Sequence, residues 1–345
     1  MVGVGKGAEN GILIKDAESL EMAHKINAIV LDKTGTITEG KPTVNEIIWT
    51  VGQDSDLHKK LLYSIENASE HPLAEAVVKK MKESGKPVKL ESIDSLTGQG
   101  IQAKHNDEYY YVGNWQLIQE KQLHIAEWMR QKAKAWMKEA STVIYFGDSA
   151  EVLAVMAIAD PIKESSVQAV RTLKNMGIEV FMLTGDNAQT AAAVARQVGI
   201  QNFKAEVLPA DKAAFVKSLQ KEGKIVGMVG DGINDSHALA EADVSIAMGK
   251  GSDIAMDVAK MTLMGSDLGK IPAAIRLSRK TVMAIKQNLF WAFIYNIIGI
   301  PLAAGVLYPI TGFLLNPMIA GAAMALSSVS VVSNSLRLKW SKLYS

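Results

Sequence analysis

Residues 28–36 read Ala-Ile-Val-Leu-Asp-Lys-Thr-Gly-Thr, four apolar residues that end abruptly at a carboxylate. Such a run predicts a short buried strand with a polar motif at its carboxyl end. Residues 180–183, 225–229 and 244–248 are apolar runs that end similarly, and helical patterns at 165–176, 188–198 and 210–220 lie between them. Alternating strands and helices predict an α/β fold with a doubly wound parallel sheet, whose ligand site lies at the carboxyl ends of its strands.

The first of these strands is separated from the others by a stretch too long to be a loop. Residues 45–156 are therefore expected to form an inserted α+β domain, with a strand at 108–112 and helices near 73–82 and 125–139.

The charge is unevenly distributed along the chain. The whole chain has 37 basic and 36 acidic residues, a net charge of +1, which argues against a nucleic-acid binder held by an overall positive field. Every acidic residue lies at or before Asp267, so residues 1–267 hold 29 basic and 36 acidic residues, a net charge of −7. Cysteine is absent, which excludes disulfides, thiolate metal sites and a cysteine nucleophile.

Two uncharged apolar runs, 289–307 and 317–336, lie near the carboxyl terminus, with basic residues at their outer ends. Each is long enough to span a hydrocarbon core as a helix, so the pair predicts a transmembrane hairpin with both ends cytoplasmic. It would follow a basic juxtamembrane segment, 268–288, and precede a cytoplasmic tail, 337–345. The alternative is two buried helices of a large soluble core.

Chemistry is expected at the strand ends. Asp32, followed by small residues whose amides can surround a phosphate, is a candidate nucleophile for phosphoryl transfer. Asp231 and Asp235 offer hard oxygen ligands of the kind that Mg²⁺ prefers. Lys212 offers a cation and Thr184 a hydroxyl to the transferring group.

Three motifs in this order and spacing resemble those of heavy-metal P-type ATPases, and above all of the copper(I)-exporting subgroup: DKTGT at 32–36, TGD at 184–186 and GDGIND at 230–235. The resemblance implies a haloacid dehalogenase-like phosphorylation domain at 25–44 and 157–267, with residues 45–156 as its nucleotide-binding domain. Residues 1–24 would be a linker from a missing membrane helix.

The same resemblance implies roles for individual residues. Asp32 would be phosphorylated, Asp231 would bind Mg²⁺, and Thr34 would lend that ion its backbone carbonyl. The remaining residues are implied to contact the phosphoryl group or to complete the three motifs: Lys33, Thr184, Gly185, Asp186, Lys212, Asn234 and Asp235.

The residue at position 34 distinguishes two kinds of enzyme that form a phosphoaspartate. Phosphoaspartate hydrolases carry a second aspartate there as a general acid and base, whereas this chain carries Thr34. A phosphoaspartate without that group is expected to persist, which suits a pump better than a phosphatase.

Two short motifs lie inside the predicted insertion. His71, fixed by the proline after it, could pack against an adenine, and Gly98 and Gly100 would allow a nucleotide to approach the backbone. The residues alone favour a helix start and an ordinary turn. The resemblance favours adenine and ribose contacts at Glu66, His71, Gly98, Gly100 and Asn114.

Polar or thioether side chains within the predicted hairpin suggest an ion site. Met324 is a soft ligand suited to Cu(I), and Ser328 lies on the same helical face. Tyr295 and Asn296 are in the first apolar run. Helix packing alone would also explain these residues; the resemblance assigns all four to Cu(I).

The resemblance covers only the carboxyl-terminal portion of the family. The missing parts are the earlier membrane helices, the actuator domain and the Cys-Pro-Cys helix. We therefore expect a P-type ATPase fragment whose whole exports Cu(I), using ATP and Mg²⁺, as an integral membrane protein with cytoplasmic catalytic domains, in the cell membrane if bacterial. Its expected partners are membrane lipid, the metal ion and a chain supplying the missing parts, without nucleic acid. The alternatives are an isolated ATPase or phosphatase module and a non-catalytic nucleotide-binding membrane subunit.

Overall fold

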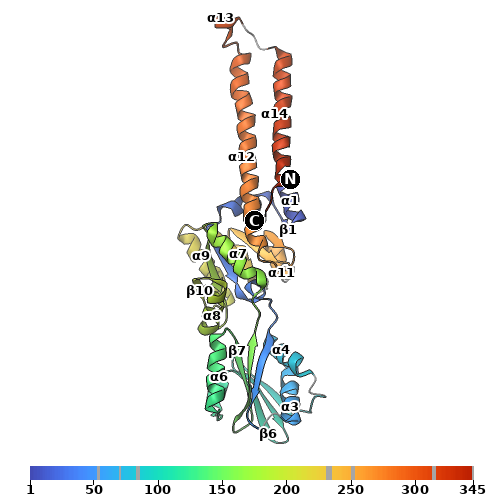
Figure 1. Cartoon of the computed structure of the whole chain (residues 1–345), viewed down its shortest axis with the longest axis vertical. Coiled ribbons are helices and arrows are strands. Elements are labelled where there is room, and N and C mark those ends of the chain that lie inside the picture. The colour runs from blue at the N-terminus through green and yellow to red at the C-terminus, as the bar shows by residue number, and fades with distance from the viewer. Residues whose placement is uncertain are drawn as a thin grey trace. The chain divides into compact units, whose positions relative to one another are not determined.

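The computed structural model describes residues 1–52, 55–69, 71–82, 86–230, 235–249, 253–312 and 316–343 (Figure 1). Its chain forms two compact units. The first contains Met1–Val30, Arg171–Glu179 and Pro209–Ser345, and the second contains Leu31–Val170 and Val180–Leu208.

A seven-stranded sheet contains the four strands expected from the apolar runs. Its order is β1 (Ile12–Ile14), β13 (Met261–Leu263), β12 (Val244–Met248), β11 (Val226–Gly230), β2 (Ala28–Asp32), β9 (Glu179–Leu183) and β10 (Asn202–Lys204). The pairs β9–β10, β11–β12 and β12–β13 are parallel, and β1 is antiparallel to β13. Every residue of β2, β11 and β12 is buried, as expected for central strands of a parallel sheet covered on both faces. The predicted parallel α/β sheet is confirmed.

Residues 1–24, expected as a linker, contain three regular elements: α1 (Val2–Glu9), β1 and α2 (Ala17–Met22), followed by a 3₁₀ turn at Ala23–Lys25. Ile12 and Leu20 are buried among them. The other helices of the first unit are α9 (Pro209–Lys221), α10 (Ser236–Glu241), α11 (Asp253–Val258), α12 (Lys270–Ala303), α13 (Tyr308–Thr311) and α14 (Pro317–Arg337), with a 3₁₀ turn at Leu338–Trp340.

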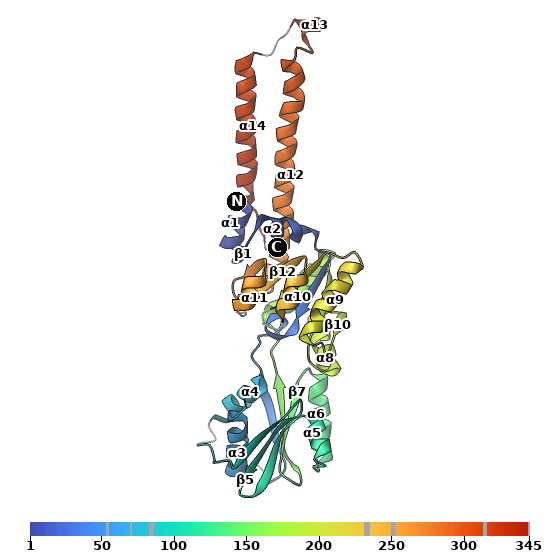
Figure 2. The same cartoon turned by 180° about the vertical axis from the view of Figure 1, so that it is seen from behind.

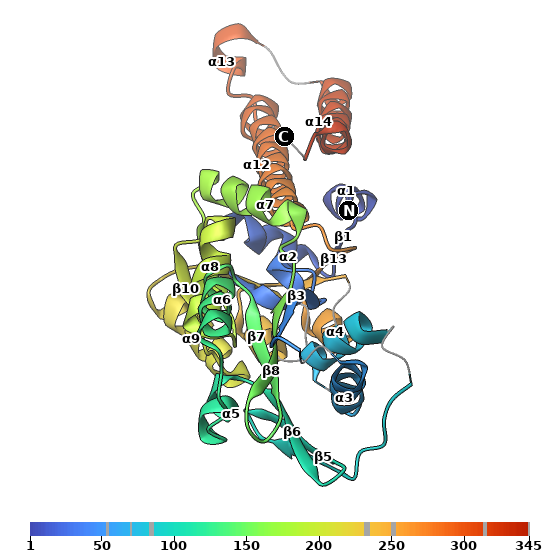
Figure 3. The ribbon, with the colours of Figure 1, turned by 60° about the horizontal axis from the view of Figure 1, so that its bottom comes forward.

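The second unit contains an antiparallel six-stranded sheet that covers the predicted insertion, 45–156, and extends slightly beyond it at both ends. Its order is β3 (Thr43–Trp49), β8 (Val152–Ala159), β7 (Thr142–Gly147), β6 (Glu108–Gly113), β5 (Gly100–His105) and β4 (Ser92–Leu96). One face packs against α3 (Asp56–Asn67) and α4 (Pro72–Met81), and the other against α5 (Trp115–Glu120) and α6 (Glu127–Lys138) (Figure 3). Tyr110 packs on the first face and Tyr111 on the second, the alternation that a strand imposes.

Strands β3 and β8, which come first and last in the chain, are neighbours in this sheet. Thr43 opposes Ala159 and Trp49 opposes Ala154 in the β3–β8 ladder. The chain therefore leaves and re-enters the region of Asp32 through one antiparallel strand pair. Helix α7 (Glu164–Asn175) follows shortly after, and α8 (Ala188–Val198) follows β9.

Helices α12 and α14 lie side by side in both side views (Figures 1 and 2). The stretch 268–288, expected as a separate juxtamembrane segment, largely belongs to α12, which begins at Lys270 and continues through the first apolar run to Ala303. Within the described ranges, no helix is both long enough and apolar enough to cross a membrane. The transmembrane hairpin stays a prediction.

Phe146 is fully buried beneath α3 and α4, stacked on Tyr110 and edge-on to Trp49. We expect Phe146→Ala to lower the free energy of unfolding of the second unit by about 3–5 kcal/mol, because it leaves a cavity in a closed core. Urea titration followed by tryptophan fluorescence measures this change. Tyr109→Ala, at an exposed position of the neighbouring strand β6, is the control and should cost much less; equal losses would contradict the assignment of Phe146 to the core.

Candidate active site

Asp32 is the last residue of β2 and is 6% exposed. The next five residues, Lys33–Ile37, form one wide turn that closes where the Thr38 amide donates to the Lys33 carbonyl at 3.0 Å. Thr34 and Gly35 leave the helical conformation within this turn, and Gly35 has φ +71°, a value that favours glycine. The strand therefore places the Asp32 carboxylate at the start of this turn, where the sequence predicts it.

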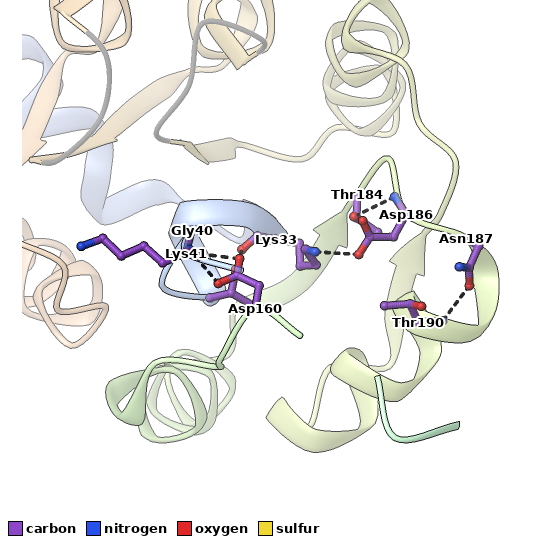
Figure 4. A network of polar contacts seen from close by, with 9 residues as sticks. Lys33, Gly40, Lys41, Asp160, Thr184, Asp186, Asn187 and Thr190 are labelled. Atoms are coloured by element: carbon purple, nitrogen blue, oxygen red, sulfur yellow. Dashed lines mark hydrogen bonds and ion pairs between the residues drawn. The ribbon is translucent and has the colours of Figure 1, made fainter. Parts of the chain in front are cut away.

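Asp160, which directly follows β8, holds the continuation of this loop (Figure 4). Its carboxylate accepts hydrogen bonds from the Thr38 hydroxyl and from the amides of Gly40 at 3.2 Å and Lys41 at 3.0 Å. Sequence reasoning missed Asp160. The available signal was an apolar run that ends at a carboxylate, the same pattern that identifies Asp32.

Two buried residues after Asp160 hold the turn itself. The Lys163 ammonium donates to the Gly35 carbonyl, and the Ser166 hydroxyl donates to the Ile37 carbonyl at 2.6 Å. The Ile37 carbonyl also accepts from the Lys163 amide at 3.0 Å, so residues 163 and 166 together supply donors to carbonyls of the turn. The conformation of the loop therefore depends on residues far along the chain.

An ion pair joins the first motif to the second: Lys33 Nζ lies 2.6 Å from Asp186 Oδ2 (Figure 4). Thr184, which is 2% exposed, accepts a hydrogen bond from the Asp186 amide at 3.1 Å. The Thr184 amide in turn donates to the Lys204 carbonyl at 3.1 Å. The second motif is thus fixed by backbone and side-chain contacts, next to the loop that follows Asp32.

A helix start follows the second motif. The Asn187 side chain accepts from the Thr190 amide at 2.9 Å and so caps α8. Gly185, Asp186, Asn187 and Thr190 all line a cavity.

This cavity, of about 680 Å³, lies within the second unit and is large enough for a nucleotide. Phosphorylation-motif residues and all five predicted nucleotide contacts line it: Lys33, Thr34, Gly185, Asp186, Glu66, His71, Gly98, Gly100 and Asn114. The structure therefore brings the two predicted groups of residues around one space.

Position 100 has no room for any side chain, so glycine is required there. A Cβ there would lie 2.1 Å from the Val112 carbonyl oxygen, and φ is +152°. The Asn114 side chain donates to the Gly98 carbonyl at 2.9 Å and caps α5 by accepting from the Leu117 amide. In this part of the cavity wall two backbone segments thus pack closely, and the Asn114 side chain joins them by a hydrogen bond.

Glu66 lies near the end of α3 and is only 4% exposed. Burial raises the pKa of its carboxyl to about 7. His71 is exposed, and its ring accepts from the Leu73 amide at 3.2 Å as the cap of α4. Glu66 therefore offers the cavity a carboxyl that is partly protonated near neutral pH, whereas the contact of His71 is also explained by helix capping.

In the first unit, Lys212 Nζ lies 2.7 Å from Asp235 Oδ1, and both side chains are almost fully buried. Gly230, the last residue of β11, lies close to Asp235, because a Cβ there would lie 2.5 Å from Asp235 Oδ2. Asp231 and Asn234 lie outside the described residues. Within the described ranges, no three histidine, aspartate or glutamate side chains are grouped as a metal site would need.

The four predicted copper ligands lie on α12 and α14. The Asn296 amide donates to the Ala292 carbonyl and the Ser328 hydroxyl to the Met324 carbonyl, both within their own helices. Met324 is 72% exposed and Tyr295 is partly buried. In the described part of the hairpin, no hydrogen bond joins the Tyr295–Asn296 pair to the Met324–Ser328 pair.

Comparison with known proteins places this geometry in a family. The family model described as haloacid dehalogenase-like hydrolase matches residues 26–243. The chain is 50% identical over 98% of its length to the "Probable copper-transporting ATPase PacS" of Synechocystis sp. and covers 46% of that protein. It is also 50% identical over 98% of its length to the "Probable copper-importing P-type ATPase A" of Enterococcus hirae and covers 45% of it.

Among solved structures, a zinc-transporting PIB-type ATPase in the E2.Pi state matches 98% of this chain with a TM-score of 0.79 and 31% identity, over 54% of its own length. The chain thus spans about half the length of the curated relatives that it matches.

The buried carboxyl of Glu66 predicts a pH-dependent stability. Its pKa is about 7 in the folded chain and near 4.5 when exposed, so the folded state binds the proton more tightly. The stabilisation that this group contributes is fully present below about pH 4.5 and is lost as the pH rises through 7. The loss lowers the free energy of unfolding by about 3 kcal/mol. Urea titrations between pH 4.5 and 8 measure it. Glu66→Gln should remove this component and the exposed Glu75→Gln should not; identical pH profiles for Glu66→Gln and wild type would contradict the assignment.

The three bonds accepted by Asp160 predict a local effect on the loop. In Asp160→Ala we expect the Gly40 and Lys41 amides to exchange hydrogen roughly tenfold faster or more, because each loses its acceptor. Hydrogen exchange with mass spectrometry of peptides covering residues 38–41 measures this. Asp148→Ala, which removes an acceptor for two amides in a different turn, is the matched control and should leave these peptides unchanged.

Proposed function

Because the chain belongs to the haloacid dehalogenase-like hydrolases, in their P-type ATPase branch, we propose that Asp32 is phosphorylated by ATP during the cycle of a copper(I) pump. The observation that carries this proposal is the cavity of about 680 Å³ that residues of the phosphorylation motifs and the predicted nucleotide contacts line together.

In this proposal ATP occupies the cavity. Its adenosine lies by Glu66, His71, Gly98, Gly100 and Asn114, and its phosphates point toward Lys33 and the loop after β2. The close backbone crossing at Gly100 supports a flat surface for the base, since no side chain can project there.

The reaction is an in-line transfer. A carboxylate oxygen of Asp32 attacks the γ-phosphorus, the bond from that phosphorus to the bridging oxygen of ADP breaks, and ADP leaves with the electron pair. Lys33 supplies a cation near the phosphates, and the rigid loop holds Asp32 in place. Thr34 offers no proton-transfer group, so the phosphoaspartate persists after ADP has left.

Mg²⁺ would neutralise phosphate charge during the transfer. The hard oxygen donors offered for it, the Asp32 carboxylate, the Thr34 carbonyl and Asp231, suit this ion. Thr184, Lys212 and Asn234 stay predicted contacts of the transferred group. Lys212 is held by Asp235, which keeps its position defined.

We further propose that α12 and α14 form a membrane hairpin that contributes Tyr295, Asn296, Met324 and Ser328 to a Cu(I) site, with export as the direction. Large apolar side chains exposed along both helices support this: Phe290, Phe293, Ile297, Ile300, Met318, Leu326 and Val329 are among them. Transport requires further membrane helices and an actuator domain, because two helices alone cannot form an alternating-access path.

Incubation of the chain with Mg²⁺ and γ-labelled ATP tests the phosphorylation step. We expect an acid-stable, alkali-labile label on the wild-type chain and at most about a hundredth of it on Asp32→Asn, which lacks the nucleophile. Asp211→Asn, outside the proposed site, is the control and should be labelled like the wild type. Equal labelling of Asp32→Asn would refute the mechanism; ATP binding without any label would favour a non-catalytic nucleotide-binding subunit.

A further inference from the structure

Three polar side chains join α12 to α14 directly. The Asn288 side chain donates to the Ser335 hydroxyl at 2.9 Å and accepts from the Asn334 side chain at 2.8 Å. Asn334 also reaches the Ala284 carbonyl at 3.5 Å. We call Asn288, Asn334 and Ser335 the amide cluster.

The amide cluster differs from the other polar groups of these helices. Asn296, Ser328 and Ser330 all donate to carbonyls four residues earlier in their own helix. Among the described residues, hydrogen bonds between the two helices occur at the amide cluster and at one neighbouring contact, from Arg337 to Gln287 at 3.1 Å. Directional contacts between the helices are thus concentrated at one end of the pair.

Such a cluster can define how two apolar helices align. Apolar side chains allow one helix to slide along another at little cost, whereas a displaced amide loses its partners in an apolar interface. A single asparagine at a helix interface is known to specify register in this way. A slip of one residue would move each partner by about 1.5 Å along the axis and about 100° around it.

Counting from the amide cluster relates it to the predicted ion ligands. Seven residues along α12 lead from Asn288 to Tyr295, and seven back along α14 lead from Ser335 to Ser328. Seven residues are nearly two helical turns, about 10.5 Å. Because the helices run in opposite directions, Tyr295 and Ser328 lie at the same level and close to the faces that carry the amide cluster.

We propose that the amide cluster sets the register of α12 against α14 and thereby positions Tyr295 and Asn296 level with the Met324–Ser328 turn. Asn288, Asn334 and Ser335 are positioning residues, since they contact each other and not the ion. The role of the four ligands rests on the proposed function, but the register itself does not.

Cross-linking tests the register, because the chain has no cysteine of its own. Two matched pairs of introduced cysteines lie at equal counts from the cluster, Tyr295 with Ser328 and Ala292 with Val331. In two mismatched pairs, Tyr295 with Val331 and Ala292 with Ser328, the counts from the cluster along the two helices differ by three residues. We expect the matched pairs to form disulfides roughly fivefold faster or more in the detergent-solubilised full chain with tetrathionate as oxidant, and Asn288→Leu to remove most of this preference.

Control variants separate register from folding. Ser330→Ala removes a hydroxyl that bonds only within α14 and should keep the preference, and Asn288→Ser, which retains a hydrogen-bonding group, should keep part of it. Equal rates for matched and mismatched pairs in the parent chain overturn the proposal. An unchanged preference in Asn288→Leu also overturns it.

A Cu(I) titration against a chelator distinguishes this proposal from the proposed function. If both hold, Asn288→Leu binds Cu(I) roughly fivefold more weakly or worse, and Asn288→Ser recovers part of the affinity. Absence of Cu(I) binding in every variant, with the cross-linking preference intact, supports the register and contradicts the ligand assignment.

Discussion

The structure around Asp32 depends on one constraint: Lys33 and residues 36–38 of the loop after β2 are buried, and the irregular backbone of this loop needs hydrogen-bond partners from elsewhere in the chain. Those partners come from residues 160–166, where Asp160 accepts from loop amides and Lys163 and Ser166 donate to loop carbonyls. The chain must therefore return to the loop after forming the whole insertion. The β3–β8 strand pair makes this return, and the loop conformation follows from it.

Two lysine–carboxylate pairs then fix the motifs, one in each unit. Lys33 with Asp186 joins two motifs separated widely in sequence, and Asp235 gives the buried ammonium of Lys212 a charged partner. The Lys212–Asp235 pair is buried; such a pair adds little net stability, but removal of one partner leaves a buried charge unpaired. The contribution of the two pairs is geometrical, since each restricts a charged group to one position within its own unit.

Local patterns predicted much of this fold. The run at 244–248 is β12 and the pattern at 188–198 is α8 with the same bounds, because Gly249 follows the strand and the helix lies between its N-cap Asn187 and its C-cap Gly199. Asp160 and Lys163 were missed, since their importance arises from contacts with a loop more than a hundred residues away. The nucleotide residues came from family resemblance, and a shared cavity encloses them. Folding of residues 1–24 depends on pairing with β13 and burial of Ile12 and Leu20, which no local signal shows.

The antiparallel pairing of β3 with β8 has a consequence for how such a chain can change over evolutionary time. Thr43 and Ala159 are neighbours in the ladder, so the two ends of the insertion are already at the spacing of a hairpin. Everything between them amounts, topologically, to one elaborate turn. Genetic exchange of that segment for a larger or smaller one would need no rebuilding of the surrounding sheet, and under the proposed function the nucleotide preference could then diversify separately from the phosphate chemistry.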